Sequence, residues 1–215
     1  GTHFPAISRG VVAAMWFGIQ TYLGALALNG IGEYFLGFSN WFMWYVLFGI
    51  LQVVSTMAGI KAVERLASLA APAIIIISIW MYYALDGIAQ SKGLNIWTFR
   101  ATGEMSLLVL FIANLAFWST MAIDIPNLTR FIKTESGARG FVKRNKSVFL
   151  GQLVALPITQ AMIAGIGAVS FIATGNWNPI EVIQGDAQGI SLLILLLLVV
   201  LAQWSTNNSA NLIPG

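Results

Sequence analysis

Long runs of apolar residues separated by short polar segments dominate the chain. Six of these runs contain no Asp, Glu, Lys or Arg, and they cover residues 11–29, 41–60, 66–85, 105–123, 147–174 and 187–213. A helix needs roughly 20 apolar residues to cross about 30 Å of hydrocarbon. A strand of a membrane barrel would instead alternate polar and apolar residues over about ten positions. The pattern therefore predicts an all-α membrane protein, with six transmembrane helices in one transmembrane domain that covers residues 1–215.

The composition supports a membrane environment. Of the 215 residues, 58% are hydrophobic and 9% are charged, which is too apolar a balance for a water-soluble domain of this size to bury in one core. Eight Trp, thirteen Phe and five Tyr suit a protein with two membrane–water interfaces. The chain has no Cys, which excludes disulfides and thiolate metal sites. We expect an integral protein of the plasma membrane, which in a bacterium is the inner membrane.

Most basic residues fall on one side of the predicted membrane. With six crossings, the N-terminal segment, the loops at 61–65 and 124–146 and the C-terminus share that side. It carries nine of the eleven Lys and Arg residues, namely Arg9, Lys61, Arg65, Arg130, Lys133, Arg139, Lys143, Arg144 and Lys146. The opposite side has Lys92 and Arg100. Because cytoplasmic loops are enriched in Lys and Arg, Gly1 is expected in the cytoplasm. The basic residues lie between apolar runs and not on one face, so a nucleic-acid partner is not expected.

Small and polar residues mark the interior of a helix bundle in a membrane. Three of the predicted spans carry them: the first has Gln20, Thr21 and Gly24, the fourth has Asn114, Ser119 and Thr120, and the sixth ends in Ser205, Thr206, Asn207, Asn208, Ser209, Ala210 and Asn211. The second, third and fifth spans are predicted to be mainly scaffold, with Pro157 expected to kink the fifth. A binding site is therefore expected between the first, fourth and sixth spans.

Two aromatic positions are candidates for that site. Trp16 and Gln20 are four residues apart, so the ring and the amide lie on one side of a helix. Such a pair can stack on a flat ring and hydrogen-bond its edge, although an interfacial Trp beside a Gln that packs on a neighbouring helix has the same spacing. Trp118 stands among Asn114, Ser119 and Thr120, away from an aromatic belt at the interface.

The end of the fourth span carries Asp124 and Pro126, where the helix is expected to break or end. Non-helical backbone survives in a membrane where it lines a cavity, and it can hold ions or substrates there. The alternative is that Asp124 caps a turn that begins at Pro126, with Thr129 and Arg130 already at the cytoplasmic surface.

In the sixth span, aliphatic residues give way to hydroxyls and amides. Ala202, Ser205, Thr206 and Ser209 share one face by their spacing of three and four residues. Two hydroxyls and a carbonyl are the hard oxygen ligands that a small alkali cation takes. A polar helix end that enters water would have a similar sequence.

An enzymatic role is poorly supported. His3 is the single histidine and lies outside the spans, and no two carboxylates lie within the spans to share acid–base chemistry. The chain also lacks a phosphate-binding glycine motif, and without His or Cys in the spans it cannot ligate haem. We therefore expect neither catalysis nor an organic cofactor.

Three segments together resemble one family, the nucleobase:cation symporters, and above all its hydantoin, allantoin and uracil branch. They are Arg9-Gly10-Val11-Val12-Ala13 with Trp16 through Tyr22; Phe117-Trp118 followed by Ile125 through Phe131; and Gln203 through Asn207 with Ala210-Asn211. The order of the segments and the predicted topology are consistent with that family. The resemblance implies a transporter of the LeuT type, in which two inverted repeats of five helices pack together. The chain would be a fragment that contains the third through the eighth helix.

The resemblance also assigns a substrate site. Trp16 and Trp118 would sandwich a planar ring, Gln20 and Asn211 would hydrogen-bond its amide edges, and Phe117 would contribute backbone polar groups. A ring such as hydantoin or uracil has two flat faces and an edge of N–H and C=O groups, so indoles and carboxamides satisfy it without a formal charge.

The resemblance further implies that the carbonyl of Ala202 and the hydroxyls of Ser205 and Thr206 form half of a sodium site. The other half would come from the first helix of the family fold, which is not among these 215 residues. One departure concerns the family pattern Asn-Ile-Pro-Asp, which here reads Asp124-Ile-Pro-Asn127. This exchange moves the charge inward and leaves open whether sodium or a proton is the coupling ion.

These observations predict a secondary active transporter that moves a nucleobase-like compound or cyclic amide together with Na⁺ or H⁺. Its partners would be a small-molecule substrate and the lipid bilayer, and a monomer is expected. A membrane scaffold or receptor subunit that does not transport remains an alternative, in which the polar helix ends hold helices together. A channel is a further alternative, although the sequence lacks a charged ring or a carbonyl-filter motif.

Overall fold

A computed structural model describes residues 3–100, 103, 106–130, 132–134, 137 and 139–213. Within the helices, the side chains outside the described part are those of Pro5, Phe117, Trp118, Thr120, Met121, Ile123, Asp124, Asn127 and Leu128. All regular elements in the described residues are helices.

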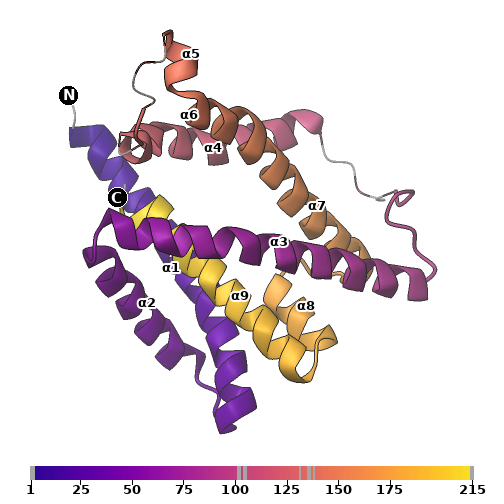
Figure 1. The fold of residues 1–215 in the computed structure, drawn as a ribbon. Helices are drawn as coiled ribbons and strands as arrows, with labels where there is room; N and C mark the ends of the chain where they lie inside the picture. Colours follow the sequence, from indigo (N-terminus) through magenta and orange to yellow (C-terminus); the bar gives the residue numbers. More distant parts are fainter. Residues whose placement is uncertain are drawn as a thin grey trace.

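The helices follow one another in the order shown in Figure 1. They are α1 (His3–Leu36), α2 (Trp41–Met57), α3 (Ile60–Ser91), α4 (Leu107–Thr129), α5 (Phe141–Arg144), α6 (Lys146–Leu150), the π-helical η1 (Gly151–Ala155), α7 (Leu156–Thr174), α8 (Pro179–Asp186), α9 (Gly189–Asn207) and the π-helical η2 (Asn208–Leu212). Each of the six predicted spans overlaps a helix or a continuous run of helical segments, although the bounds differ.

Four of the helical segments are long and apolar enough to cross a membrane: Ala6–Leu36, Ile60–Ser91, Lys146–Thr174 and Gly189–Leu212. The apolar helices Trp41–Met57 and Leu107–Ala116 are shorter. Many large apolar side chains on all of these helices are exposed, as expected of surfaces that face lipid. Six membrane crossings with the bounds given above therefore stay a prediction.

Local signals explain where the first helices end and begin. Gly37 (φ +61°) and Gly59 (φ +89°) adopt backbone conformations that L side chains rarely take, and they follow α1 and α2 directly or within two residues. The side chain of Asn40 caps α2, because its Oδ1 accepts a hydrogen bond from Met43 N at 3.1 Å. The short turn that contains Gly37 and Asn40 allows α1 and α2 to pack side by side, and Gly59 lies between α2 and α3.

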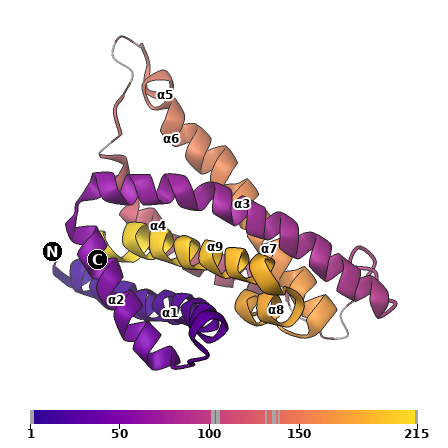
Figure 2. The same ribbon diagram turned by 60° about the horizontal axis from the view of Figure 1, so that its bottom comes forward.

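Helix α9 lies at the centre of the packed part of the molecule, between α1 and α3 (Figures 1 and 2). Helix α2 packs on α1, and α7 packs on α3. The buried core includes Phe48 of α2, Leu85 of α3, Ile183 of α8 and Leu196 of α9. This arrangement places the polar C-terminal part of α9 against α1 and α2.

Pro157 and Pro126 have different effects on the helices that contain them. Before Pro157, five residues form the π-helix η1, a widened turn at the place where the proline ring would crowd the preceding carbonyls. The expectation that the fourth helix breaks or ends at Asp124–Pro126 was wrong, since α4 continues through Pro126 to Thr129. The physical reason is that proline removes one backbone donor, while its carbonyl still accepts a hydrogen bond from Arg130 N at 3.1 Å.

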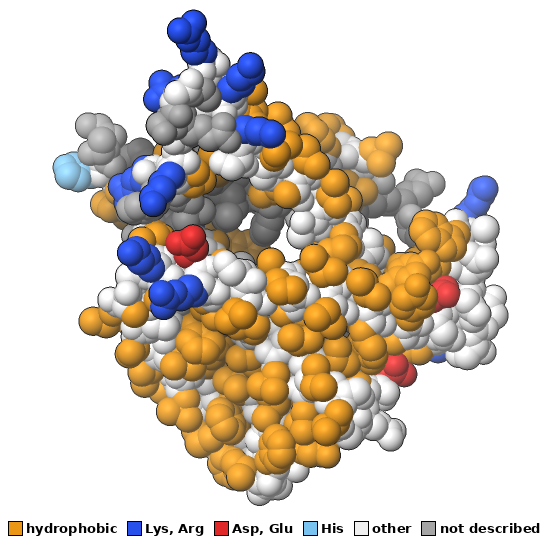
Figure 3. Space-filling model, viewed as in Figure 1, with side chains coloured by type: hydrophobic (Ala, Val, Ile, Leu, Met, Phe, Trp, Pro, Cys, Tyr) orange, Lys and Arg blue, Asp and Glu red, His pale blue; other side chains and the backbone are white. Residues whose placement is uncertain are grey.

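Basic side chains gather at one end of the molecule. Figure 3 shows Lys and Arg side chains around α5 and α6 and beside the adjacent ends of α1 and α3. Both chain termini lie at this end in Figure 1. The charge asymmetry in the sequence is thus also an asymmetry in space.

Candidate functional site

A buried polar cluster joins α1, α2 and α9. Thr21, Gln52 and Asn207 are fully buried, and Asn211 is buried nearby. Asn207 Nδ2 shares its two hydrogens among three acceptors, Gln52 Oε1 at 2.7 Å, Thr21 Oγ1 at 3.1 Å and Phe17 O at 3.1 Å. Asn211 Nδ2 in turn donates to Asn207 Oδ1 at 2.6 Å. Inside lipid, such a network holds helices together and fixes the direction of each amide.

A second group of hydrogen bonds lies beside this cluster. Ser55 Oγ accepts from Trp204 Nε1 and from Asn208 Nδ2, both at 2.8 Å, and therefore links α2 to α9 and η2. The ring of Trp204 also packs edge-on against Phe48, with 6.4 Å between the centroids. Two parallel sets of contacts therefore hold α2 against the end of α9.

Trp16 and Gln20 lie on α1 and are both half-buried. Gln20 Oε1 is buried, and no described residue donates a hydrogen bond to it. A buried oxygen without a donor carries a desolvation cost of about 1–3 kcal/mol. A ligand that brings an N–H group to this oxygen would remove that cost.

The other predicted substrate residues are only partly described. Phe117 and Trp118 belong to α4, but their side chains lie outside the described part of the chain. Asn211 lies in η2, which contacts both α1 and α4. The structure thus places Asn211 beside the helices that carry the other predicted residues, and the ring sandwich itself stays a prediction.

The predicted ion ligands lie together on α9. Thr206 Oγ1 donates to the carbonyl oxygen of Ala202 at 2.9 Å, so these two oxygens are neighbours. Ser205 is buried, and its carbonyl accepts from Ser209 Oγ at 2.8 Å. The described residues contain no group of three or more His, Cys, Asp or Glu side chains that could hold a metal. The hydroxyl and carbonyl oxygens suit an alkali cation better than a transition metal.

Sequence reasoning missed the contribution of the second span. Gln52 is fully buried and takes part in the central cluster, and Ser55 anchors the second set of contacts. A signal was present, because Ser55 and Thr56 follow Gln52 by three and four residues in an otherwise apolar helix, so both can share its face. The assignment of this helix mainly to scaffold was therefore incomplete.

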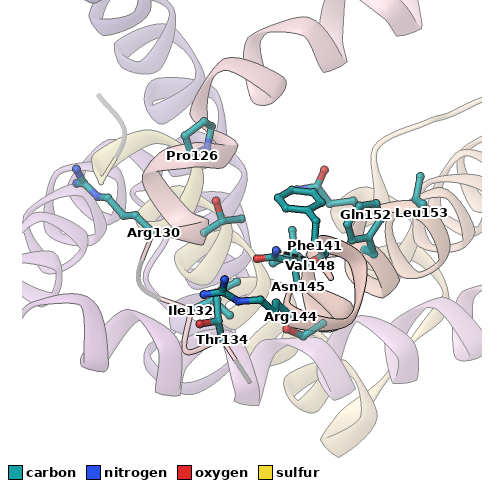
Figure 4. Close-up of a pocket in the computed structure, with 13 residues that line it drawn as sticks. Pro126, Arg130, Ile132, Thr134, Phe141, Arg144, Asn145, Val148, Gln152 and Leu153 are labelled. Carbon is teal, nitrogen blue, oxygen red and sulfur yellow. Dashed lines mark hydrogen bonds between the residues drawn. The ribbon is translucent and has the colours of Figure 1, made fainter. Parts of the chain in front are cut away.

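Two larger cavities lie away from these residues. One of about 520 Å³ lies between the end of α4 and α5, α6 and η1, and its lining includes Thr134, Phe141, Arg144 and Gln152 (Figure 4). The other, of about 530 Å³, lies between α3 and α7 beside Tyr82 and is mainly apolar. Neither lining includes Trp16, Gln20 or Asn211.

The whole chain, residues 1–215, matches the family described as permeases for cytosine/purines, uracil, thiamine and allantoin. The chain belongs to this family. The match confirms the resemblance predicted from the sequence segments. The family consists of permeases, in agreement with the expectation that the chain is not an enzyme.

Several curated proteins are similar to the chain. A hydantoin permease of Microbacterium maritypicum is 30% identical over 99% of the chain and 45% of its own length. A purine-uracil permease of Arabidopsis thaliana is 24% identical over 99% of the chain and 38% of its own length. An allantoin permease of Bacillus subtilis is 24% identical over 99% of the chain and 46% of its own length. The chain thus spans less than half the length of these relatives.

A solved structure described as the inward-facing conformation of Mhp1 has the same fold. It aligns with a TM-score of 0.76 and 28% identity, over 100% of this chain and 47% of that one. The chain is therefore an integral membrane protein with part of the LeuT-type inverted-repeat fold, as predicted.

Proposed function

We propose that the protein to which this chain belongs is a secondary active transporter that carries a cyclic amide such as a hydantoin, allantoin or uracil. The observation that carries the proposal is the buried, unpartnered oxygen of Gln20, on a helix that also packs against η2, which contains Asn211, in a chain that matches a permease family throughout. A ring with N–H groups on its edge satisfies such an oxygen. Trp16 and Trp118 would stack on its two faces, and Phe117 would contribute backbone polar groups.

Uptake by cells that express the full-length gene tests this function. Radiolabelled uracil, allantoin and benzyl-hydantoin are supplied with and without an inward sodium gradient. We expect at least one compound to accumulate above the level in cells without the gene, and to accumulate more with the coupling gradient. Equal uptake of all three compounds in both kinds of cell would refute the proposal.

For the coupling ion, we propose sodium, held in part by the carbonyl of Ala202 and the hydroxyls of Ser205 and Thr206. Its remaining ligands would come from another part of the full-length protein. Because ion and substrate would favour the same occluded state, each should raise the affinity of the other by the same factor. A proton is the alternative ion.

Replacing Thr206 with alanine should raise the sodium concentration for half-maximal uptake by about tenfold or more, since one oxygen contact to a charged group contributes roughly 1.5–3 kcal/mol. The maximal uptake at saturating sodium should change less. Thr206→Ser keeps the hydroxyl and is the matched control. An unchanged sodium dependence in Thr206→Ala would remove Thr206 from the ion site.

For the orientation, we propose that the basic end of the molecule faces the cytoplasm of a plasma membrane. The chain has no cysteine, so single cysteines can be introduced as reporters where the full-length protein allows it. A cysteine in place of Lys143 should react with a membrane-impermeant maleimide only after the cells are opened. One in place of the exposed Trp97 should react in intact cells. The reverse pattern would invert the topology.

A further inference from the structure

Two backbone carbonyls fix the direction of the amides in the buried cluster. Gln52 Nε2 donates to Phe48 O at 3.1 Å and to Thr21 Oγ1 at 3.1 Å. A backbone carbonyl can accept but cannot donate, so the amino group of Gln52 must lie on this side. Gln52 Oε1 consequently faces α9, where it accepts from Asn207 at 2.7 Å.

The second carbonyl determines the direction of Asn207 in the same way. Asn207 Nδ2 lies 3.1 Å from Phe17 O as well as 2.7 Å from Gln52 Oε1. Turning this amide over would bring its oxygen against two oxygens that cannot donate to it. Asn207 Oδ1 therefore points toward η2, where Asn211 Nδ2 donates to it at 2.6 Å.

The direction of Asn211 follows from that of Asn207. If the Asn211 amide were reversed, its oxygen would face Asn207 Oδ1 without a hydrogen between them. Asn211 must therefore use its amino group in the cluster. Its own oxygen is left for another partner, and no described residue donates a hydrogen bond to it. Because an amide oxygen can only accept, a partner for it must bring an N–H or O–H group.

We propose that Gln52 and Asn207 are positioning residues, which hold Asn211 so that its amide oxygen faces the substrate. The site then selects a ring edge that donates N–H, as a cyclic imide or urea does, over an edge that presents only acceptors. This inference rests on the proposed function, because it requires Asn211 to contact the transported compound. It extends that function by assigning a substrate chemistry and two residues on which it depends.

Binding of N-methylated analogues to the purified full-length transporter tests the proposal. Affinities are measured by tryptophan fluorescence for hydantoin, uracil and allantoin, and for the N-methyl derivatives of each compound that binds. In the wild type, at least one N-methyl derivative should bind about 100-fold or more weakly than its parent, because a buried acceptor is left without its donor. In Asn207→Leu the ratio of the affinity for the parent compound to the affinity for its N-methyl derivative should fall below about tenfold. The Asn211 amide can then turn over and present its amino group to the substrate.

Two further variants separate positioning from general loosening. Ser55→Ala removes the neighbouring contacts between α2 and the end of α9 without touching the amide chain, so it should lower thermal stability and leave the ratio unchanged. Gln52→Met removes the hydrogen bonds of the Gln52 amide at nearly constant side-chain volume and should also reduce the ratio. It tests the positioning role if Asn207→Leu does not fold.

The measured affinities separate the positioning role from the transport function. If the wild type binds a parent compound and Gln52→Met and folded Asn207→Leu keep its discrimination, the positioning role is wrong while transport stands. If Ser55→Ala lowers the ratio as much as Asn207→Leu does, the effect is general loosening and the positioning role is again wrong. If the wild type binds none of the three compounds, the proposed function fails, and the inference that rests on it fails too.

Discussion

Replacing Gly24 with alanine is expected to destabilise the full-length protein by about 3 kcal/mol, the upper end of the usual cost of overpacking. A Cβ at this position would lie 2.1 Å from Phe48 Cε1 and within 3 Å of two further atoms of the same ring. Phe48 is 1% exposed and rests against Trp204, so its ring has no space to retreat. Helices α1 and α2 would have to move apart, and the contact between Gln52 and Thr21 would lengthen.

Thermal unfolding in detergent, followed by the loss of monodisperse protein, measures this effect. Gly18→Ala is the matched control on the same helix, because a Cβ there would meet only Tyr45 Oη at an ordinary 3.5 Å. Alanine is the better helix former, so this control should melt at the same temperature as the wild type or higher. If Gly24→Ala melts no lower than Gly18→Ala, the close packing of α1 on α2 is wrong.

Replacing Trp118 with alanine is expected to abolish measurable substrate binding, a loss of about 100-fold or more. Stacking of a flat ring on an aromatic side chain contributes roughly 1–3 kcal/mol, and removal of the indole also opens one face of the ring to water. Titration of the purified full-length protein with the transported compound measures the loss. Trp118→Phe, which keeps a smaller flat ring, should bind with intermediate affinity.

The control for this prediction is Trp97→Ala, since Trp97 is 79% exposed and lies between α3 and α4, away from the polar cluster. The affinity of Trp97→Ala for the transported compound should equal that of the wild type. Wild-type affinity in Trp118→Ala would show that this indole does not stack on the substrate, and the substrate site would then have to be sought elsewhere between the helices.

Sequence patterns local to one helix were sufficient to predict much of the fold. Uncharged runs of about 20 residues located the helices, because a backbone in hydrocarbon must satisfy its own hydrogen bonds and cannot present charges to lipid. The spacing in the sixth span predicted an oxygen face of Ala202, Ser205 and Thr206, and the family resemblance added Asn211; the roles of these residues in binding stay predictions. The end of α4 was predicted less well, since the helix continues one turn past Asp124 and Pro126 to Thr129.

Contacts between helices could not be predicted from patterns local to one helix. The sequence shows that Gln52 lies in an apolar helix, but its partners are 31 residues away at Thr21 and 155 residues away at Asn207. Which of them it meets depends on how α1, α2 and α9 are rotated and how closely they approach, and the small residue Gly24 permits that approach.

The sequence by itself determined the environment of each helix and the chemical groups available, because lipid and water select residues one helix at a time. Only the tertiary structure decided which way the amides of Gln52, Asn207 and Asn211 point. A carboxamide can present an oxygen or an amino group to either side, and the neighbours on other helices, above all the carbonyls of Phe17 and Phe48, remove that choice.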